Sequence, residues 1–333
     1  MSSAEESQAA AYASPVDYDT YGLYSVKDAK LGEDGFERPL SLYPFHGRLS
    51  TGGSTEHPAE PGRYHLYLAW SCPWAQRAAI VRMLAGLSDL VSVSYVHEVR
   101  DGRGWAFRED TGPDPVNGFT LLRQAYDATH PDYPGHISVP VLWDRHTHRI
   151  VSNHFPDLTI DLATQFEGLA QAGIDLYPPR LRADIDALNE TIYETVNNAV
   201  YRIGNEPDQG TYDVLVHQLF DTFDMLERRL AGNRFLFGNR VTESDVRLWV
   251  TLARFDAVYH GLFKVNLRRL VDYPHLWAYA RDLYQRPAFR ETTDFAAIKR
   301  GYFHGFSKLN PYRVVPAGPV LDWDAPSDRD HLS

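Results

Sequence analysis

The hydrophobic pattern changes its period once along this 333-residue chain, and that change constrains the fold more than any other feature. Before residue 171, short apolar runs typical of strands are mixed with helical segments. After residue 180, apolar residues recur at three- and four-residue spacing, which is typical of amphipathic helices. A linker containing Gly173, Pro178 and Pro179 separates the two patterns. The sequence therefore predicts an α/β domain followed by an all-helical (all-α) domain.

The α/β part, over residues 63–170, has the element order of a thioredoxin-like domain. Its predicted elements, in chain order, are a strand (64–70), a helix (73–87), a strand (91–97), a hairpin (138–144 and 149–152) and a helix (156–169). Gly and Pro accumulate over residues 98–136 with little periodicity, so this stretch is expected to be an insertion over the surface. Residues 1–62 also lack a sustained period and are expected to form an extended arm.

The second part, over residues 181–310, is expected to contain helices alone. Apolar repeats at helical spacing predict two long helices (181–199 and 214–230). The segment VTESDV predicts the start of another, with Thr242 as the N-cap and Asp245 as its partner in a capping box. Residues 311–333 are rich in Pro, Gly and Asp and are expected to form a tail.

Charge and hydropathy exclude several classes of protein. The 33 basic and 44 acidic residues give a formal charge of −11, without a basic cluster, so nucleic acid and anionic membranes are not expected as partners. Apolar runs fall short of the roughly 18 to 20 residues that a membrane-spanning helix needs. Residues 1–20 lack the basic and apolar regions of a secretory signal. We therefore expect a cytoplasmic protein.

Cys72 is the only cysteine in the chain, which excludes an internal disulfide, a CxxC pair and a multi-cysteine zinc site. It lies in LYLAWSCPWAQRA, between a predicted strand and a helix that begins with Pro73. The free N–H groups and the dipole at a helix start lower a thiol's pKa, so the pattern predicts a nucleophilic thiolate. The alternative is a buried cysteine that acts as a small apolar residue. Any disulfide of Cys72 must involve another molecule.

Further candidates lie elsewhere in the chain. Pro140, in Ser-Val-Pro-Val, suits either a cis peptide that presents backbone to an extended ligand or a plain edge-strand proline. Three tyrosines near predicted helix ends could donate to a thiolate or a phenolic oxygen, or could simply fill the core (Tyr201, Tyr259 and Tyr302). His146 and His148 share a predicted turn without a third ligand nearby, so we predict no metal site.

Several stretches resemble the glutathionyl-hydroquinone reductases, the omega-like Xi class of glutathione transferases. They include PGRYHLYLAWSCPWAQRA, SVPVLWD, RIVSN, TESDVRLWVTLARFDAVYHGLFKVN, DYPHLWAYARDLYQ and NPYRVVPAGP. The resemblance implies the glutathione transferase fold, a homodimer, and reduction of thiol-conjugated hydroquinones. It also implies that a cysteine thiolate attacks the sulfur of the conjugate, releases the hydroquinone and enters a mixed disulfide, which a second thiol resolves.

The resemblance further implies roles for individual residues. Cys72 matches the nucleophile, and Tyr201 matches a proton donor to the leaving hydroquinone. Tyr259 and Tyr302 match hydroxyls near the thiolate, and Trp105 matches a residue that packs on the thiol cofactor. The backbone that pairs with the cysteinyl part of the thiol is expected in one short stretch (His136, Ile137, Ser138, Val139 and Pro140, with Val139 making the contact).

The chain departs from the family pattern where the γ-glutamyl end of glutathione would bind. The family continues IVSN with Glu-Ser, which holds the ammonium and carboxylate of that end, whereas this chain has His154 and Phe155. An imidazole cannot replace a carboxylate as the partner of an ammonium, and a phenyl ring offers no donor. Losing both contacts should weaken glutathione binding by about 2 to 5 kcal/mol. The family's basic residue before SVPV is His136 here, and the His after CPWA is Gln76.

These departures favour a thiol without a γ-glutamyl end. Mycothiol, an N-acetylcysteine joined to a glucosamine-inositol, is the first candidate, because its sugar hydroxyls could meet His154 and its face could pack on Phe155. The alternative is glutathione held by other residues. Other functions stay open: a conjugating transferase or a glutaredoxin-like thiol exchanger that uses the same thiolate, or a non-catalytic binding protein of the same fold.

Overall fold

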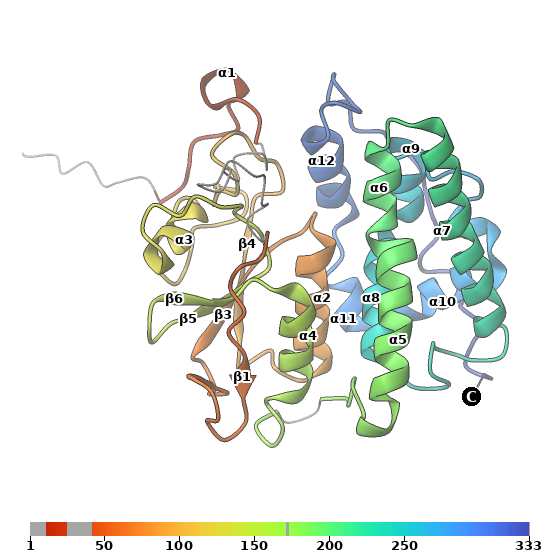
Figure 1. Cartoon of the computed structure of the whole chain (residues 1–333), viewed down its shortest axis with the longest axis horizontal. Coiled ribbons are helices and arrows are strands. Elements are labelled where there is room, and N and C mark those ends of the chain that lie inside the picture. Colours follow the sequence, from red (N-terminus) through yellow and green to blue (C-terminus); the bar gives the residue numbers. More distant parts are fainter. Residues whose placement is uncertain (1–10, 25–41, 171–172, 333) are drawn as a thin grey trace, which may run out of the picture.

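The computed structural model describes residues 11–24, 42–170 and 173–332. In Figure 1 the sheet and its helices occupy one side of the molecule and the C-terminal helices the other, with α2 and α4 between them. An α/β domain followed by an all-helical domain is the fold class that the sequence predicts. Of the predicted N-terminal arm (residues 1–62), residues 1–10 and 25–41 lie outside the described ranges.

The N-terminal domain contains a four-stranded mixed sheet with the strand order β4-β3-β5-β6. Its strands are β3 (Tyr64–Ala69), β4 (Ser92–Val96), β5 (Val141–Asp144) and β6 (Arg149–Ser152). The central β3 pairs in parallel with β4 and antiparallel with β5, and β5 and β6 form the predicted hairpin. Every residue of β3 is buried, and a strand covered on both faces is apolar on both.

Three helices complete this domain (α2, Pro73–Leu84; α3, Arg123–Thr129; α4, Phe155–Thr164). The predicted helices around α2 and α4 are confirmed, with ends a few residues shorter than expected. α2 and α4 contact each other, and α2 also contacts the C-terminal helices α8 and α11. One face of α2 therefore serves the N-terminal domain and another serves the interface between the domains.

Residues 98–136, expected as an insertion over the surface, also have buried parts. They include α3, which packs against β6, and the side chains of Trp105, Phe107 and Tyr126 are buried. The helix spans only seven residues between segments rich in Gly and Pro. Two turns are too few for a helical period to stand out in the sequence.

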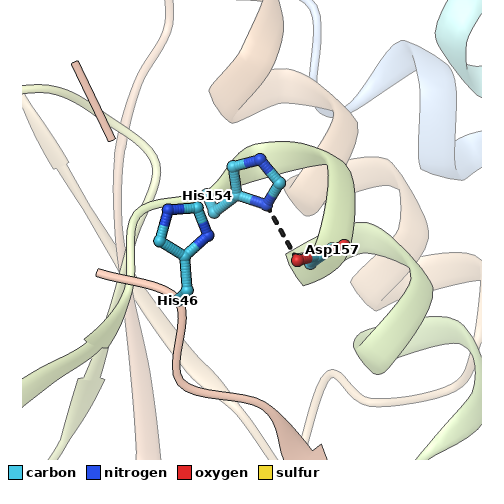
Figure 2. A group of neighbouring side chains, drawn as sticks. All are labelled: His46, His154 and Asp157. Carbon is cyan, nitrogen blue, oxygen red and sulfur yellow. Dashed lines mark ion pairs between the residues drawn. The ribbon is translucent and has the colours of Figure 1, made fainter. Parts of the chain in front are cut away.

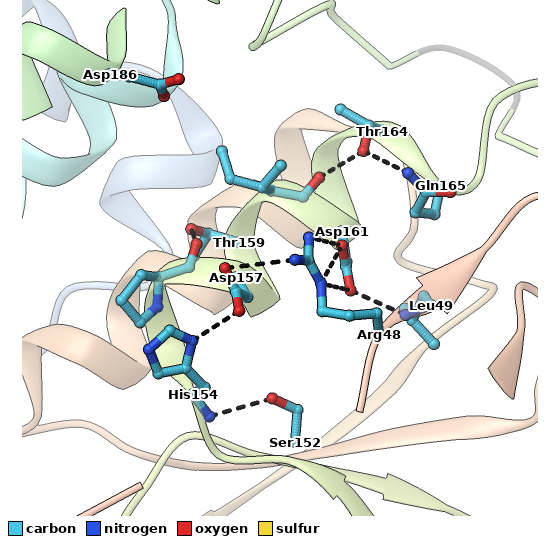
Figure 3. Close-up of polar contacts among 12 residues, drawn as sticks. Arg48, Leu49, Ser152, His154, Asp157, Thr159, Asp161, Thr164, Gln165 and Asp186 are labelled. Atoms are coloured by element: carbon cyan, nitrogen blue, oxygen red, sulfur yellow. Dashed lines mark hydrogen bonds and ion pairs between the residues drawn. The ribbon is translucent and has the colours of Figure 1, made fainter. Parts of the chain in front are cut away.

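The described part of the N-terminal arm is mostly irregular. It contains one short helix and a pair of two-residue parallel strands (α1, Tyr18–Tyr21; β1, Leu49–Ser50; β2, His57–Pro58). The N–H of Gly47 donates to the carbonyl oxygen of Val151 over 2.9 Å. Arg48 donates three hydrogen bonds to the carboxylate of Asp161 in α4, two from Nε and one from a terminal nitrogen (Figure 3). These contacts fix the arm beside the start of α4.

The C-terminal domain is helical throughout its described residues, apart from connecting turns. Its α-helices are α5 (Arg182–Ile192), α6 (Ala199–Asn205), α7 (Gln209–Leu230), α8 (Glu243–Arg254), α9 (His260–Leu262), α10 (Pro274–Tyr284), α11 (Pro287–Arg290) and α12 (Phe295–Gly305). Single turns of 3₁₀-helix (η2, Pro179–Leu181; η5, Leu270–Asp272) or π-helix (η3, Tyr193–Asn197; η4, Phe255–Tyr259) adjoin them. The helix expected over 181–199 is α5 continued through η3, and the helix expected over 214–230 is α7.

The predicted capping box at the start of α8 is confirmed. Asp245 is fully buried and accepts hydrogen bonds from the N–H and hydroxyl of Thr242, at 2.7 and 2.8 Å. It also accepts from the N–H of Leu236 and the hydroxyl of Tyr279. One carboxylate therefore ties the N-terminus of α8 to the preceding turn and to α10.

The C-terminal segment packs against the helical domain instead of extending from it. The ring of Trp323 is buried, with its centre 4.7 Å from that of Trp277 and 5.5 Å from that of Trp249. Arg329 donates to the carbonyl oxygen of Leu230 at the end of α7. None of the helices in the described ranges is both long and apolar enough to span a bilayer.

Candidate active site

Cys72 lies at the N-terminus of α2, directly after the turn that ends β3. It is the N-cap residue, and Pro73 follows at the first helical position, where a missing N–H costs nothing. The Sγ atom of Cys72 lies 3.5 Å from the carbonyl oxygen of Val139, which precedes Pro140 across a cis peptide bond. The tertiary structure thus joins two predicted parts of the site that lie 67 residues apart in the sequence.

Burial raises the pKa of the Cys72 thiol above its ordinary value, and several positive groups oppose this effect. The backbone N–H groups of Ala75 and Trp74 and the guanidinium groups of Arg254 and Arg100 favour the thiolate. The predicted lowering of the pKa is therefore wrong in its net direction. The helix N-terminus acts as expected, but desolvation by the surrounding protein outweighs it.

Arg254, at the end of α8, holds the turn that carries Cys72. Its side chain is fully buried and donates to the carbonyl oxygens of Ser71 and Trp70, with a donor–acceptor distance of 3.2 Å in each case. It also donates to the side-chain oxygen of Gln76 in α2. Arg254 therefore positions Cys72 and places a positive charge near it. The sequence does not point to this residue, because an arginine within a mostly apolar helix gives no sign of its partner.

Gln76 and Gly301 close the contact between the two domains at this point. The amide nitrogen of Gln76 donates to the carbonyl oxygen of Thr292 at 3.0 Å and to the hydroxyl of Thr293 at 2.7 Å. A Cβ atom at Gly301 of α12 would lie 2.3 Å from the Cβ of Ser71. Glycine at this position lets α12 approach the turn before Cys72 closely.

The three tyrosines singled out in the sequence meet in one hydrogen-bonded cluster. The hydroxyls of Tyr259 and Tyr302 are 2.8 Å apart, those of Tyr201 and Tyr259 are 3.4 Å apart, and Tyr201 and Tyr302 are also bonded. They come from α6, η4 and α12. Burial raises the pKa of each hydroxyl, so all three are neutral proton donors near pH 7.

A pocket of about 150 Å³ opens beside Cys72. Tyr201 and Tyr302 line it from the helical domain, and Trp74 and Trp105 line it from the first domain. Trp105, which the resemblance expects to pack on the bound thiol, therefore lines the pocket beside Cys72. Tyr259 is fully buried behind this lining and reaches the pocket through its two hydroxyl partners.

Three predicted thiol-binding residues lie beside this pocket without lining it. The Nδ1 atom of His136 is 2.7 Å from the hydroxyl of Tyr24, and burial lowers the pKa of His136 to about 4, so this imidazole is neutral. Ile137 is buried and its N–H donates to the same hydroxyl. Ser138 is buried and hydrogen-bonded to the hydroxyl of Tyr126. These contacts hold the segment that carries Val139, which lies just before β5.

Phe155 is buried, with 3% of its surface exposed. Its ring stacks on that of Trp74 with the centres 4.5 Å apart and meets the ring of Tyr43 edge-on at 5.2 Å. Because Trp74 lines the pocket, Phe155 contributes to the wall from behind. An aromatic cluster therefore occupies the start of α4, where the family pattern has a serine.

His154 lies beside Phe155 as the N-cap residue of α4. Figure 2 shows its ring between the ring of His46, from the arm, and the carboxylate of Asp157. The Nδ1 atom of His154 is 2.9 Å from Asp157, and the two imidazole centres are 4.4 Å apart. Arg48 reaches the other side of Asp157 at 3.5 Å (Figure 3).

The three residues of Figure 2 are the one group in the described ranges whose ligating atoms gather as a metal site would, all within 4.8 Å of one another. Ligand atoms that bind zinc tetrahedrally lie about 2.0 Å from the metal and therefore about 3.3 Å from one another. A separation of up to 4.8 Å is a looser criterion than this. Asp157 already contacts two basic side chains, and it lies in the first turn of α4, where the helix dipole disfavours a cation. We therefore describe the group as a polar network and assign it no metal.

A thioredoxin-like domain with a cysteine at the start of its first helix, facing an all-helical domain, is the architecture of the glutathione transferases. Residues 209–282 match the family model of the glutathione S-transferase C-terminal domain. The chain is 40% identical over 295 residues to glutathionyl-hydroquinone reductase PcpF of Sphingobium chlorophenolicum, covering 88% of this chain and 92% of that protein. It is 42% identical over 289 residues to glutathionyl-hydroquinone reductase YqjG of Escherichia coli, covering 85% and 87%.

The fold comparison gives the same answer. The glutathione-bound structure of YqjG matches with a TM-score of 0.83 at 40% identity, over 86% of this chain and 96% of that one. An Xi-class transferase of Natrialba magadii matches with a TM-score of 0.86 at 37% identity, over 93% and 97%. The chain belongs to the glutathionyl-hydroquinone reductase family, the Xi class of glutathione transferases.

Proposed function

We propose that this protein is a thiol-dependent reductase of thiol-conjugated hydroquinones. The Cys72 thiolate attacks the thioether sulfur, the bond between that sulfur and the ring carbon breaks, and the ring carbon takes a proton. The products are the hydroquinone and a mixed disulfide on Cys72. A second thiol attacks the mixed disulfide and releases the thiolate together with a disulfide of the two small thiols. The two electrons gained by the ring come from those two thiols.

The observation that carries this proposal is that Cys72 and two neutral phenols, Tyr201 and Tyr302, line one pocket. A nucleophile and a proton donor are the two groups that the first half of the reaction needs. The second half needs an external thiol, because the chain has no second cysteine. Relatives named glutathionyl-hydroquinone reductases, at 40% and 42% identity, support the same reaction class.

In this mechanism Tyr201 donates the proton that the leaving ring requires. Tyr259 and Tyr302 hydrogen-bond to its hydroxyl, so they can stabilise negative charge left on its oxygen. Arg254 keeps the turn with Cys72 in place through the carbonyl oxygens of that turn. The carbonyl group of Val139, next to the thiol, belongs to the backbone that we expect to pair with the cysteinyl part of the ligand.

We propose mycothiol as the thiol, with glutathione as the alternative. The glutathione-bound structure of YqjG supports glutathione. Two features of this chain favour a thiol without a γ-glutamyl end. His154 offers no carboxylate to an ammonium, and Phe155 is turned into an aromatic cluster and offers no hydroxyl.

The test uses menadiol conjugated to glutathione or to mycothiol, with intact mass and released menadiol measured for wild type and Cys72→Ser. Release and a thiol adduct on wild type, with neither on Cys72→Ser, are expected. A larger yield with mycothiol would support the proposed thiol. An equal or larger yield with glutathione would remove the argument from His154 and Phe155 and leave the reductase in place. Absence of release and adduct with both conjugates would refute the reductase.

Three other functions predict different results. A glutaredoxin-like exchanger would reduce small mixed disulfides without releasing menadiol, and a conjugating transferase would form thioethers from an electrophile. A non-catalytic binding protein would bind the conjugates equally well as wild type and as Cys72→Ser.

We further propose that the protein is a homodimer and lies in the cytoplasm, as the family resemblance implies. Light scattering of the purified protein would test the first proposal, and cell fractionation would test the second.

A further inference from the structure

Arg100 lies in the pocket of Cys72 and has no role in the mechanism above. It follows β4, and its side chain is half-buried. Its guanidinium carbon lies 4.3 Å from the centre of the Trp105 ring and 4.5 Å from the centre of the Tyr24 ring. Two aromatic faces therefore hold the guanidinium group while its N–H donors remain available at the edge.

The guanidinium of Arg100 makes no hydrogen bond or ion pair with any other residue in the described ranges. Its neighbours differ: Arg103 and Arg108 both pair with Asp101, at 2.7 and 3.7 Å. The carboxylate of Glu98, which also lines the pocket, is 2.6 Å from Arg300 of α12. Both of these carboxylates thus have another cation, and Arg100 is left without a carboxylate partner among the described residues.

A half-buried cation without a partner is costly, since it has lost part of its hydration. Burial lowers the pKa of Arg100, although an arginine remains charged in proteins. A carboxylate is the ligand that best offsets this loss of hydration, because its two oxygens match the planar pair of N–H donors of the guanidinium group. The cation also lies beside the nucleophile, so a ligand that binds it would be held close to the reacting sulfur.

We propose that Arg100 forms an anion subsite of the Cys72 pocket and selects conjugates that carry a carboxylate. This inference rests on the proposed reductase, and it names the class of substrate. With mycothiol as the thiol, whose cysteine carboxyl is joined to the sugar as an amide, the carboxylate comes from the hydroquinone ring; with glutathione it can also come from the thiol half of the conjugate. Both sources offer the same chemistry, and the substrates below separate them.

The experiment uses four methylhydroquinone conjugates. The thiol half is N-acetylcysteine or its amide, and the ring carries a carboxymethyl group or its amide, in every combination. Rates of hydroquinone release give kcat and KM for wild type, Arg100→Met and Arg100→Lys. Arg149→Met is the matched control, because Arg149 is an exposed arginine at the start of β6, remote from the pocket lining.

Arg100→Met is expected to raise KM about 10- to 100-fold for conjugates with a carboxylate on one particular half, relative to the neutral conjugate. Because the charge of Arg100 also favours the Cys72 thiolate, its effect on the thiol itself should be the same for all four conjugates. Arg100→Lys should retain part of the preference, and Arg149→Met all of it. An equal change for all four conjugates would overturn the proposal. So would a wild type that does not distinguish acid from amide.

A role of Arg100 through the thiolate alone would give another pattern. The pH dependence of Cys72 alkylation would then shift in Arg100→Met, without any carboxylate preference in wild type, and this would also overturn the subsite. Calorimetric binding of the four conjugates to Cys72→Ser, with and without Arg100→Met, tests the subsite if wild type releases no hydroquinone. Loss of a carboxylate preference in the double variant supports the subsite even then, and equal affinities refute it.

Discussion

Gly301→Ala tests how closely α12 must approach the nucleophile. In a helix interior, alanine is more favourable than glycine by about 1 kcal/mol, so this substitution normally stabilises. At Gly301 the new Cβ would lie 2.3 Å from the Cβ of Ser71 and 3.2 Å from the carbonyl oxygen of Glu98. Carbon atoms in contact lie at least about 3.5 Å apart, so α12 and the turn must separate by about 1.2 Å. A Cβ cannot rotate away, and neither can a carbonyl oxygen of the backbone.

Overpacking of this kind costs about 1 to 3 kcal/mol, and the short contact places Gly301→Ala near the upper end. After the gain in helix propensity, the free energy of unfolding should fall by about 2 kcal/mol. The separation also moves Tyr302, the next residue, away from Cys72, and a shift of about 1 Å can lower turnover by up to 100-fold.

Urea unfolding and menadiol release measure the two effects. Gly261→Ala in α9 is the control, since a Cβ there meets no atom within 4 Å, and it should leave turnover nearly unchanged without lowering the free energy of unfolding. If Gly301→Ala keeps wild-type stability and turnover, the proposed close contact between α12 and the turn of Cys72 is refuted.

Three further predictions concern the thiol, the core and the thiol-binding end. The thiolate is the reactive form and burial raises the pKa of Cys72, so its alkylation rate should still be rising above pH 8.5; a plateau below pH 7 would contradict this. Asp245→Ala should lower the free energy of unfolding in urea by about 3 to 5 kcal/mol, because several buried donors lose their acceptor, whereas Asp245→Asn should cost less. Exchanging His154 and Phe155 for Glu and Ser should lower KM at least tenfold for glutathionyl relative to mycothiol conjugates; an unchanged ratio would count against the cofactor argument.

Secondary structure was predictable wherever an element was long enough to show its period. β3, α2 and the β5–β6 hairpin lie close to their expected bounds, because strand and helix periods are local properties of the sequence. The capping box of Thr242 and Asp245 also follows from three residues of sequence. α3 could not be predicted in this way, because its seven residues lie between segments rich in glycine and proline.

The sequence by itself determined which residue is the candidate nucleophile, Cys72, and its place at a helix start. A single cysteine between a strand and a proline-initiated helix has one position relative to the backbone N–H groups, whatever surrounds it. The same count required an external thiol for any disulfide. These conclusions depend on covalent order and local geometry, so no tertiary contact could alter them.

Only the tertiary structure decided the environment of that nucleophile. Arg254 reaches the turn of Cys72 from a residue more than 180 positions away, and the tyrosine cluster draws its members from three separate elements. The pKa of Cys72 rises because desolvation depends on everything packed around the thiol, whereas the helix N-terminus that lowers it is local. The proposed role of Arg100 likewise depends on tertiary contacts, because Asp101 and Glu98 are paired with Arg103 and Arg300. Proximity between distant residues is set by packing, and packing has no signature in a single sequence.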